Sequence, residues 1–274
     1  ASMYAVYHGP QGLRKIAKRI ASFSSLFRIG LQSMGITCEN QYGFDTVCIP
    51  SQTKTHDIMR MGLHQEYNFR IFNDASICIS FDETTTGHDV GHLLALFAQG
   101  LGKAIPQLNP HTGCPVVAAE QLQLALPSTL IRTSSYLPQK VFHSHHSETA
   151  MLRYIRSLSD KDLALDRCMI ALGSCTMKLN ATSEMIPMTW PEFAHIHPFA
   201  PASQRKGYAL LDQQLQKWLC AITGYAGISL QPNAGSQGEY AGLLAVKEFH
   251  KANGQAHRTI CLIPSSAHGT NPAS

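Results

Sequence analysis

The segment 231–240, QPNAGSQGEY, combines small residues with amide and hydroxyl side chains. It follows a short apolar run, GISL, and precedes a helical pattern, AGLLAVKEFH, so we expect a strand-to-helix junction. The first turn of a helix has unpaired N–H groups and a partial positive charge, which attract anions. Small residues let the backbone approach an anion, while Ser236 adds a hydroxyl donor and Gln237 an amide donor. Gly235, Ser236 and Gln237 therefore indicate a phosphate site, although a plain strand-to-helix turn has the same pattern.

Three further segments add side chains that suit a ligand site. The run 188–201, MTWPEFAHIHPFAP, is rich in proline and aromatic residues and predicts a rigid loop. The run 265–274, SSAHGTNPAS, follows an expected strand, at the end where α/β sheets bind ligands. The run 171–180, ALGSCTMKLN, gathers polar groups, and an ordered loop between domains is its alternative explanation. Its polar candidates are Ser174, Thr176, Lys178 and Asn180.

Histidines and cysteines raise two other chemistries. The chain has 14 histidines, including HSHH at 143–146 and HIH at 195–197, so a metal-binding protein is one alternative. A zinc site needs three or four ligands in fixed geometry, and we expect adventitious binding at most. The 8 cysteines form no CxxC pair, so we expect reduced, mostly buried thiols rather than a disulfide scaffold. We expect Cys175 to be a buried, inert thiol.

The elements that would position these residues fall into three regions. Residues 1–100 alternate helical and strand patterns, which predicts an α/β unit. Residues 101–145 contain five prolines and predict a connector with one short helix near 117–126. In the first region we expect helices over 3–34, 55–67 and 86–98, the last capped near Thr86, and strands over 43–49 and 75–81.

Residues 146–274 predict a second α/β unit. Ser147 is a capping residue for one helix, and Gly224 ends an amphipathic helix that begins at 206. A strand at 227–230, a helix at 238–252 and a strand at 258–264 then predict a β-α-β unit, which normally has parallel strands.

Bulk properties exclude some classes of function. With 274 residues and 44% hydrophobic content, the chain is long enough for one large or two ordinary globular domains. A net charge of +4, with no basic stripe interleaved with aromatics, does not suggest nucleic-acid binding. We see no membrane-spanning run and no signal peptide, and the start at Ala1 suggests a piece of something longer.

Taken together, these motifs resemble those of the glycine cleavage system P-protein family, the decarboxylating glycine dehydrogenases. The resemblance covers almost the whole chain and is most specific in LGSCTMKLN, TWPEFA-IHPF, QPN-G-QGEYAGL and CLIP-SAHGTNPAS. In the phosphate loop the family usually has Ser-Gly-Ala. This chain has Ala234, Gly235 and Ser236 there, so the hydroxyl lies two positions later.

The resemblance implies an α/β fold class, made of pieces of the fold-type-I, aminotransferase-like fold of PLP-dependent transferases. A small α/β domain would be followed by the start of a large, mostly parallel-sheet domain. Residues 1–100 would be the small domain at the end of the family's N-terminal half, 101–145 the connector, and 146–274 the incomplete start of the catalytic, PLP-binding domain.

The family's cofactor is pyridoxal 5'-phosphate, whose pyridinium ring takes up electrons as carbon dioxide leaves glycine. The aminomethyl group then passes to the lipoyl group of the H-protein. By this resemblance Gly235, Ser236 and Gln237 would hold the phosphate, and the run 171–180 would line the substrate side. His268 would stack on the pyridine ring of the cofactor. Thr270 would reach the oxygen that the cofactor carries on this ring.

Lys178 is the most conspicuous lysine near polar residues, but the resemblance gives it no covalent role. In the family the Schiff-base lysine lies downstream of HGTNPAS, as does the acidic partner of the pyridine nitrogen. Because the sequence stops at Ser274, we assign no catalytic residue and expect an inactive part of a glycine decarboxylase. We also expect it to be weakly stable, with an exposed sheet edge. A non-catalytic assembly or regulatory chain is the alternative.

The partners implied are glycine, the lipoylated H-protein, and a second subunit or half in a dimer or two-half assembly. We expect neither nucleic acid nor membrane as a partner. The compartment would be the cytoplasm in a bacterium or the mitochondrial matrix in a eukaryote.

Overall fold

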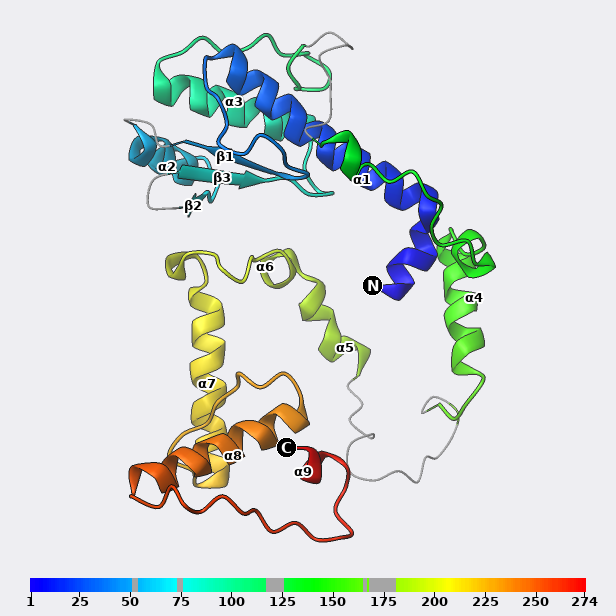
Figure 1. Ribbon diagram of the computed structural model, residues 1–274, viewed down its shortest axis with the longest axis vertical. Coiled ribbons are helices and arrows are strands. Elements are labelled where there is room, and N and C mark those ends of the chain that lie inside the picture. Colours follow the sequence, from blue (N-terminus) through cyan, green and yellow to red (C-terminus); the bar gives the residue numbers. More distant parts are fainter. Residues whose placement is uncertain (51–53, 73–75, 117–125, 165–166, 168–180) are drawn as a thin grey trace. The chain divides into compact units, whose positions relative to one another are not determined.

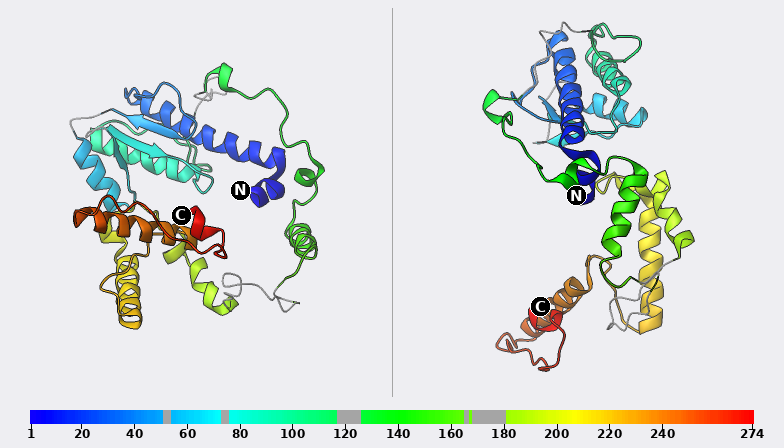
Figure 2. Two further views of the ribbon diagram at one scale, coloured as in Figure 1. Left: turned by 60° about the horizontal axis from the view of Figure 1, so that its bottom comes forward. Right: turned by 90° about the vertical axis from the view of Figure 1, so that its right-hand side faces the viewer.

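The computed structural model describes residues 1–50, 54–72, 76–116, 126–164, 167 and 181–274. The chain divides into two compact units, Ala1–Lys178 and Leu179–Ser274. Figures 1 and 2 show the elements of each unit. The predicted division into 1–100, 101–145 and 146–274 stays a prediction.

The first unit mixes helix and sheet, as the alternating pattern predicted. Figure 1 labels its larger elements. In chain order its helices and strands are α1 (Ser2–Ser33), β1 (Thr46–Ile49), α2 (Thr55–His64), β2 (Arg70–Phe72), β3 (Ser76–Ser80), α3 (Gly87–Leu101), the 3-10 turns η2 (Ser128–Leu130) and η3 (Lys140–His143), and α4 (Glu148–Ser159).

The sheet of this unit has three strands in the order β1-β3-β2, and both pairs are antiparallel. β1 and β3 lie within the strands predicted at 43–49 and 75–81. β2 was not predicted, because it is three residues long and exposed throughout, so it shows no alternation. The helix predicted at 117–126 falls almost entirely outside the described residues.

The core of this unit forms where α1 and α3 lie side by side against the sheet (Figures 1 and 2). Phe27 of α1 is fully buried and makes edge-to-face contacts with Phe81 and Phe97, at ring-centroid distances of 5.5 and 5.9 Å. Such aromatic pairs add to the free energy gained by burial. Gly30 lets the two helices approach closely, since a Cβ there would lie 2.5 Å from a methyl group of Leu94.

α1 is broken near its start. Gly9 has φ 60° and ψ 179°, and Pro10 follows it inside the helix. Proline disfavours helical backbone in the preceding residue, and only glycine readily adopts the positive φ found here. A Cβ on Gly9 would also lie 2.5 Å from the carbonyl oxygen of Phe142. The break is held by the chain around η3, where Tyr136 Oη donates to Pro10 O at 2.6 Å.

Local capping chemistry sets the helix ends. Thr86 and Asp89 form a reciprocal capping box at the start of α3, as the sequence predicted for Thr86. Ser147 Oγ accepts from Ala150 N at 3.2 Å at the start of α4, which confirms the predicted cap. These short-range bonds explain why both boundaries could be predicted from sequence.

A disulfide joins Cys48 of β1 to Cys78 of β3. The expectation of reduced thiols is therefore wrong for this pair. The two residues are 30 positions apart in sequence, and the antiparallel register brings them opposite each other. Spacing in sequence did not reveal them because the contact is non-local. The free thiols among the described cysteines are Cys38, Cys114, Cys220 and Cys261.

The second unit is helical in its described residues, 181–274. α7 ends at Gly224 in the left-handed conformation, as predicted, and α8 begins three residues before its predicted start at 238. Its elements are α5 (Thr182–Met185), η4 (Ile186–Thr189), α6 (Pro191–Ala194), η5 (Ala202–Gln204), α7 (Lys206–Thr223), α8 (Gly235–Ala252) and α9 (Thr270–Ala273).

The strands predicted at 227–230 and 258–264 are not formed; both segments lack strand structure. A strand exists through hydrogen bonds to a neighbouring strand, and no described segment pairs with either one. The predicted parallel β-α-β unit is thus corrected to a helix flanked by two unpaired segments. In the described part of the chain, no helix is long and apolar enough to cross a membrane.

Candidate functional site

The predicted phosphate loop lies at the start of α8. Ala234 is the N-cap residue, with extended backbone at φ −151° and ψ 160°, and no side chain caps the helix. Gly238 N donates to Ala234 O at 3.0 Å, which opens the helical hydrogen-bond ladder. The N–H groups of Gly235, Ser236 and Gln237 lie before that bond. They therefore have no hydrogen-bond partner within the helix. The structure thus brings together three of the predicted residues on one exposed helical turn.

The surroundings of this turn leave room for a ligand. A Cβ added to Gly235 would meet no atom within 4 Å. The first turn of α8 carries no acidic residue, which would repel an anion, and its last turn carries His250 and Lys251. These features suit the partial positive charge of a helix N-terminus.

Gln237 has a second role that the sequence did not indicate. Its Oε1 accepts from Asn233 N at 3.0 Å, so the side chain closes the loop in front of the helix. The carboxamide nitrogen of Gln237 is the end of the side chain that can donate to an anion. The carbonyl oxygen of the Gln237 side chain therefore stabilises the conformation of the loop.

The predicted residues His268 and Thr270 lie in the last turn of the described chain. His268 is exposed and its carbonyl accepts from Asn271 N at 3.1 Å. Thr270 is half-buried and begins α9, and its carbonyl accepts from Ser274 Oγ at 3.0 Å. Asn271 Nδ2 donates to Glu239 Oε2 at 3.1 Å, which ties α9 to the start of α8.

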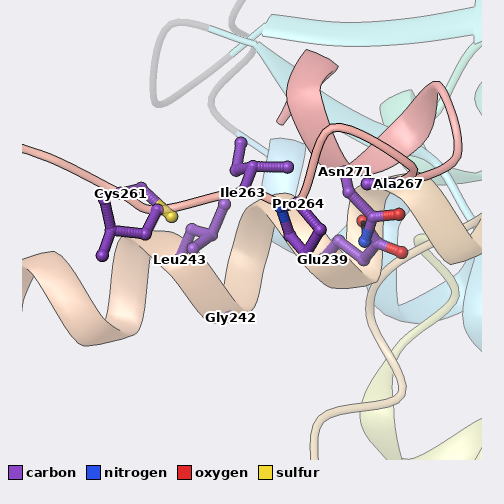
Figure 3. Close-up of a pocket in the computed structure, with 9 residues that line it drawn as sticks. Glu239, Gly242, Leu243, Cys261, Ile263, Pro264, Ala267 and Asn271 are labelled. Atoms are coloured by element: carbon purple, nitrogen blue, oxygen red, sulfur yellow. Dashed lines mark hydrogen bonds between the residues drawn. The ribbon is translucent and has the colours of Figure 1, made fainter.

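A cavity of about 600 Å³ lies between α8 and the segment that leads to α9. Figure 3 shows Glu239 and Asn271 at one end of it and Cys261 at the other. The five predicted cofactor residues are absent from its lining. Sequence reasoning missed Glu239 and Asn271, although both lie inside the motifs QGEYAGL and HGTNPAS. The lining residues are Glu239, Gly242, Leu243, Cys261, Leu262, Ile263, Pro264, Ala267 and Asn271.

The predicted substrate-side residues Ser174, Thr176, Lys178 and Asn180 lie outside the described residues, as does Cys175. The lysine that would bond covalently to a cofactor was assigned to no position of this chain. The described candidate site is therefore the start of α8 together with the turn at 264–274.

The described histidines of the segment 143–146 contact backbone carbonyl and aromatic groups. His143 Nε2 lies 3.0 Å from Leu137 O, and His146 Nδ1 lies 2.7 Å from Tyr7 O. His145 stacks on Tyr154 at a centroid distance of 4.3 Å. Within the described ranges, no three His, Cys, Asp or Glu residues are grouped so that they could hold a metal ion.

Comparison with known proteins agrees with the motifs. Residues 1–97 match the family model of the glycine cleavage system P-protein. The whole chain is 59% identical to the glycine dehydrogenase (decarboxylating) of Variovorax paradoxus strain S110 and 54% identical to that of Paraburkholderia xenovorans strain LB400. The chain spans 27% and 28% of the lengths of these two relatives. It therefore belongs, as a part of that length, to the glycine cleavage system P-protein family.

Proposed function

We propose that this chain is part of a pyridoxal 5'-phosphate-dependent glycine decarboxylase, and that the start of α8 holds the phosphate group of the cofactor. The whole protein would remove carbon dioxide from glycine and pass the aminomethyl group to the lipoyl group of an H-protein. The observation that carries the proposal is the uncapped first turn of an 18-residue helix inside the QPNAGSQGEY motif.

The residues present fit a phosphate group. The first-turn N–H groups, the hydroxyl of Ser236 and the carboxamide nitrogen of Gln237 are all donors, which a phosphate dianion requires. The absence of a capping side chain leaves the donors free, and the open space at Gly235 admits the anion. When bound, the cofactor supplies an electron sink for decarboxylation.

His268 and Thr270 would complete this part of the site. An exposed imidazole can stack on an aromatic ring, as His145 does on Tyr154 in the first unit. The bond between Asn271 and Glu239 supports this role, because it fixes the turn that carries both residues against α8. Ser174, Thr176, Lys178 and Asn180 would face the substrate.

The finer fold is also a proposal. In the whole protein, this chain would contribute to the fold-type-I, aminotransferase-like fold of PLP-dependent transferases. The exposure of Ile260, 88%, and Leu262, 91%, supports it, because these apolar side chains leave surface that other parts of the protein would cover. The covalently bonded lysine and the acidic partner of the pyridine ring would be supplied by other parts of the protein, so this chain alone would not turn over glycine. A dimer or two-half assembly, in the bacterial cytoplasm or the mitochondrial matrix, completes the proposal.

Binding of the cofactor to the chain tests the proposed role of α8. In Ala234→Ser, the new hydroxyl would cap the helix and compete with the phosphate for the same N–H groups. A cap contributes about 1 kcal/mol, so we expect pyridoxal 5'-phosphate to bind about fivefold more weakly by isothermal titration. Ala252→Ser, the same change at the other end of α8, should leave binding unchanged.

Two further readouts separate phosphate binding from covalent binding. Pyridoxal, which lacks the phosphate, should bind at least tenfold more weakly than the phosphorylated cofactor. Borohydride reduction followed by mass spectrometry should find no single labelled lysine. Equal affinity in the two serine variants, or for the two ligands, would refute the phosphate site. A stoichiometric adduct on Lys178 would refute the absence of a covalent lysine instead.

A further inference from the structure

The cross-strand pair Cys48 and Cys78 has an unusual backbone setting. The two residues are directly opposed in the register of β1 and β3, with a Cα–Cα distance of 4.4 Å. Cys48 N donates to Asn40 Oδ1 at 2.8 Å, and Cys48 O accepts from Glu39 N at 2.9 Å. Both backbone groups of Cys48 therefore point away from β3. This is the closely spaced, non-hydrogen-bonded type of antiparallel pair, so the disulfide is the direct tie between the strands at this position.

The two cysteines differ in their exposure to solvent. Cys48 lies on an outer strand and is half-buried, whereas Cys78 lies on the central strand and is 7% exposed. A thiolate that attacks a disulfide must approach one sulfur directly. An external thiol therefore reaches Cys48 Sγ more readily than Cys78 Sγ.

Charged groups lie near both cysteines. Arg70 of β2 is directly opposite Cys78, and opposed residues in antiparallel strands project on the same face. Its guanidinium is exposed and lies 5.4 Å from the centroid of the Phe72 ring. The Glu39 carboxylate reaches the strand of Cys78, where its Oε1 accepts from Ser76 Oγ at 2.5 Å. On the side of Cys48, Arg28 donates to Asn40 O at 2.6 Å and to Thr46 O at 3.0 Å. A neighbouring cation stabilises a thiolate, so Arg70 assists the departure of Cys78, while solvent access decides which sulfur is attacked.

We propose that the Cys48–Cys78 disulfide is a thiol-exchange site, opened by small-molecule thiols that attack Cys48 Sγ and displace Cys78. The attacking thiolate forms a bond to Cys48 Sγ while the protein S–S bond breaks, and Cys78 leaves as a thiolate that takes up a proton. A second thiol then attacks the mixed disulfide and releases Cys48. Overall, two external thiols are oxidised to one disulfide, and the protein disulfide is reduced to two thiols.

Reduction of the disulfide has a structural consequence for the sheet. With the disulfide broken, no ladder bond from Cys48 holds β1 to β3 at this position, since both backbone groups of Cys48 are used on the opposite side. The sheet of the first unit is then held by the remaining pairs and by the core. Reduction should loosen β1 without unfolding the helices.

The test uses a neutral thiol on the full chain, so that the charge of the reagent plays no part. The chain would be oxidised with glutathione disulfide, exposed briefly to 2-mercaptoethanol, quenched with acid and mapped by mass spectrometry. We expect the first adduct on Cys48 rather than Cys78, with a bias of about tenfold. In Arg70→Gln, the exchange should be about threefold slower, because the cation opposite Cys78 that stabilises the leaving thiolate is removed. Arg60→Gln, an exposed arginine of α2, should not change the rate.

Three outcomes would overturn the proposal. The first is that both thiols remain free after oxidation of the folded chain. The second is an equal or larger adduct on Cys78, which would contradict the assigned direction of attack. The third is an unchanged rate in Arg70→Gln, which would remove the electrostatic argument. Hydrogen exchange on the reduced and oxidised chain then measures the loosening, which should be confined to β1 and its partners.

Discussion

The two units of the chain are built from helices of similar quality, but they bury very different amounts of apolar surface. In the first unit Phe27 and Leu94 are fully buried in a continuous core. In the described residues of the second unit, Ala200 is the one buried apolar residue, while Ile222 of α7 is 79% exposed. Local caps and periodicity are enough to define a helix, but burial depends on the elements packed against it. The comparison therefore separates what a segment specifies by itself from what its neighbours supply.

The largest expected difference in stability follows from truncating one apolar side chain in each unit. Phe27→Ala should destabilise the first unit by about 3–5 kcal/mol, because it leaves a cavity among Phe81 and Phe97. Leu262→Ala should change stability by less than about 0.5 kcal/mol, because that side chain is 91% exposed. Hydrogen exchange resolved by mass spectrometry would measure both units in one sample. A large loss of protection in the second unit of Leu262→Ala would show that Leu262 is buried in solution.

An intermediate difference in stability is expected when one glycine of each unit is replaced by alanine. Gly30→Ala should cost about 1–3 kcal/mol, because the new methyl group would overlap Leu94 at the contact between α1 and α3. Gly242→Ala, in the interior of α8, meets no atom within 4 Å and should stabilise that helix by about 0.5–1 kcal/mol through propensity alone. Urea denaturation followed by circular dichroism would reveal the opposite signs. If both substitutions stabilise the chain, α1 and α3 do not approach as closely as described.

The smallest expected effect is electrostatic and confined to the first unit. A hydrogen bond from the Thr84 hydroxyl is the main cause that holds the pKa of Asp82 below its usual value of 3.8, with further bonds from Thr85 opposing the effect of burial. A depressed folded-state pKa contributes stability above the unfolded value, and that contribution is lost as the pH falls through the folded pKa. Stability should therefore decline as the pH falls below about 4.

Asp82→Asn should remove part of this decline, and urea midpoints at pH 7, 5 and 3 would measure it. Asp212→Asn, on α7 in the second unit, is the matched control. An equally steep pH dependence in Asp82→Asn would show that other carboxyl groups account for the decline.

Sequence reasoning predicted those parts of the fold that depend on short-range chemistry. The caps at Thr86 and Ser147 and the end of α7 at Gly224 each rest on contacts within a few residues. What could not be predicted depends on partners far along the chain. β2 exists because β3 pairs with it, and the Cys48–Cys78 disulfide follows from the register of two strands.

The candidate site divides in the same way. The position of Gly235, Ser236 and Gln237 on a helical first turn follows from their own sequence. The use of Gln237 to close its loop and the bond between Asn271 and Glu239 depend on backbone geometry, which residue types do not reveal.

The break in α1 at Gly9 has a consequence for the order in which the chain folds. The residues that fix this break lie far away in sequence: Tyr136 bonds to Pro10 across 126 positions, and His146 bonds to Tyr7 across 139. Contacts of such long separation carry the largest loop-closure entropy and form late. During synthesis, the first turns of α1 leave the ribosome well before the segment 136–146, which bonds to them. Among the helices of this chain, α1 would then be one of the last to reach its final position.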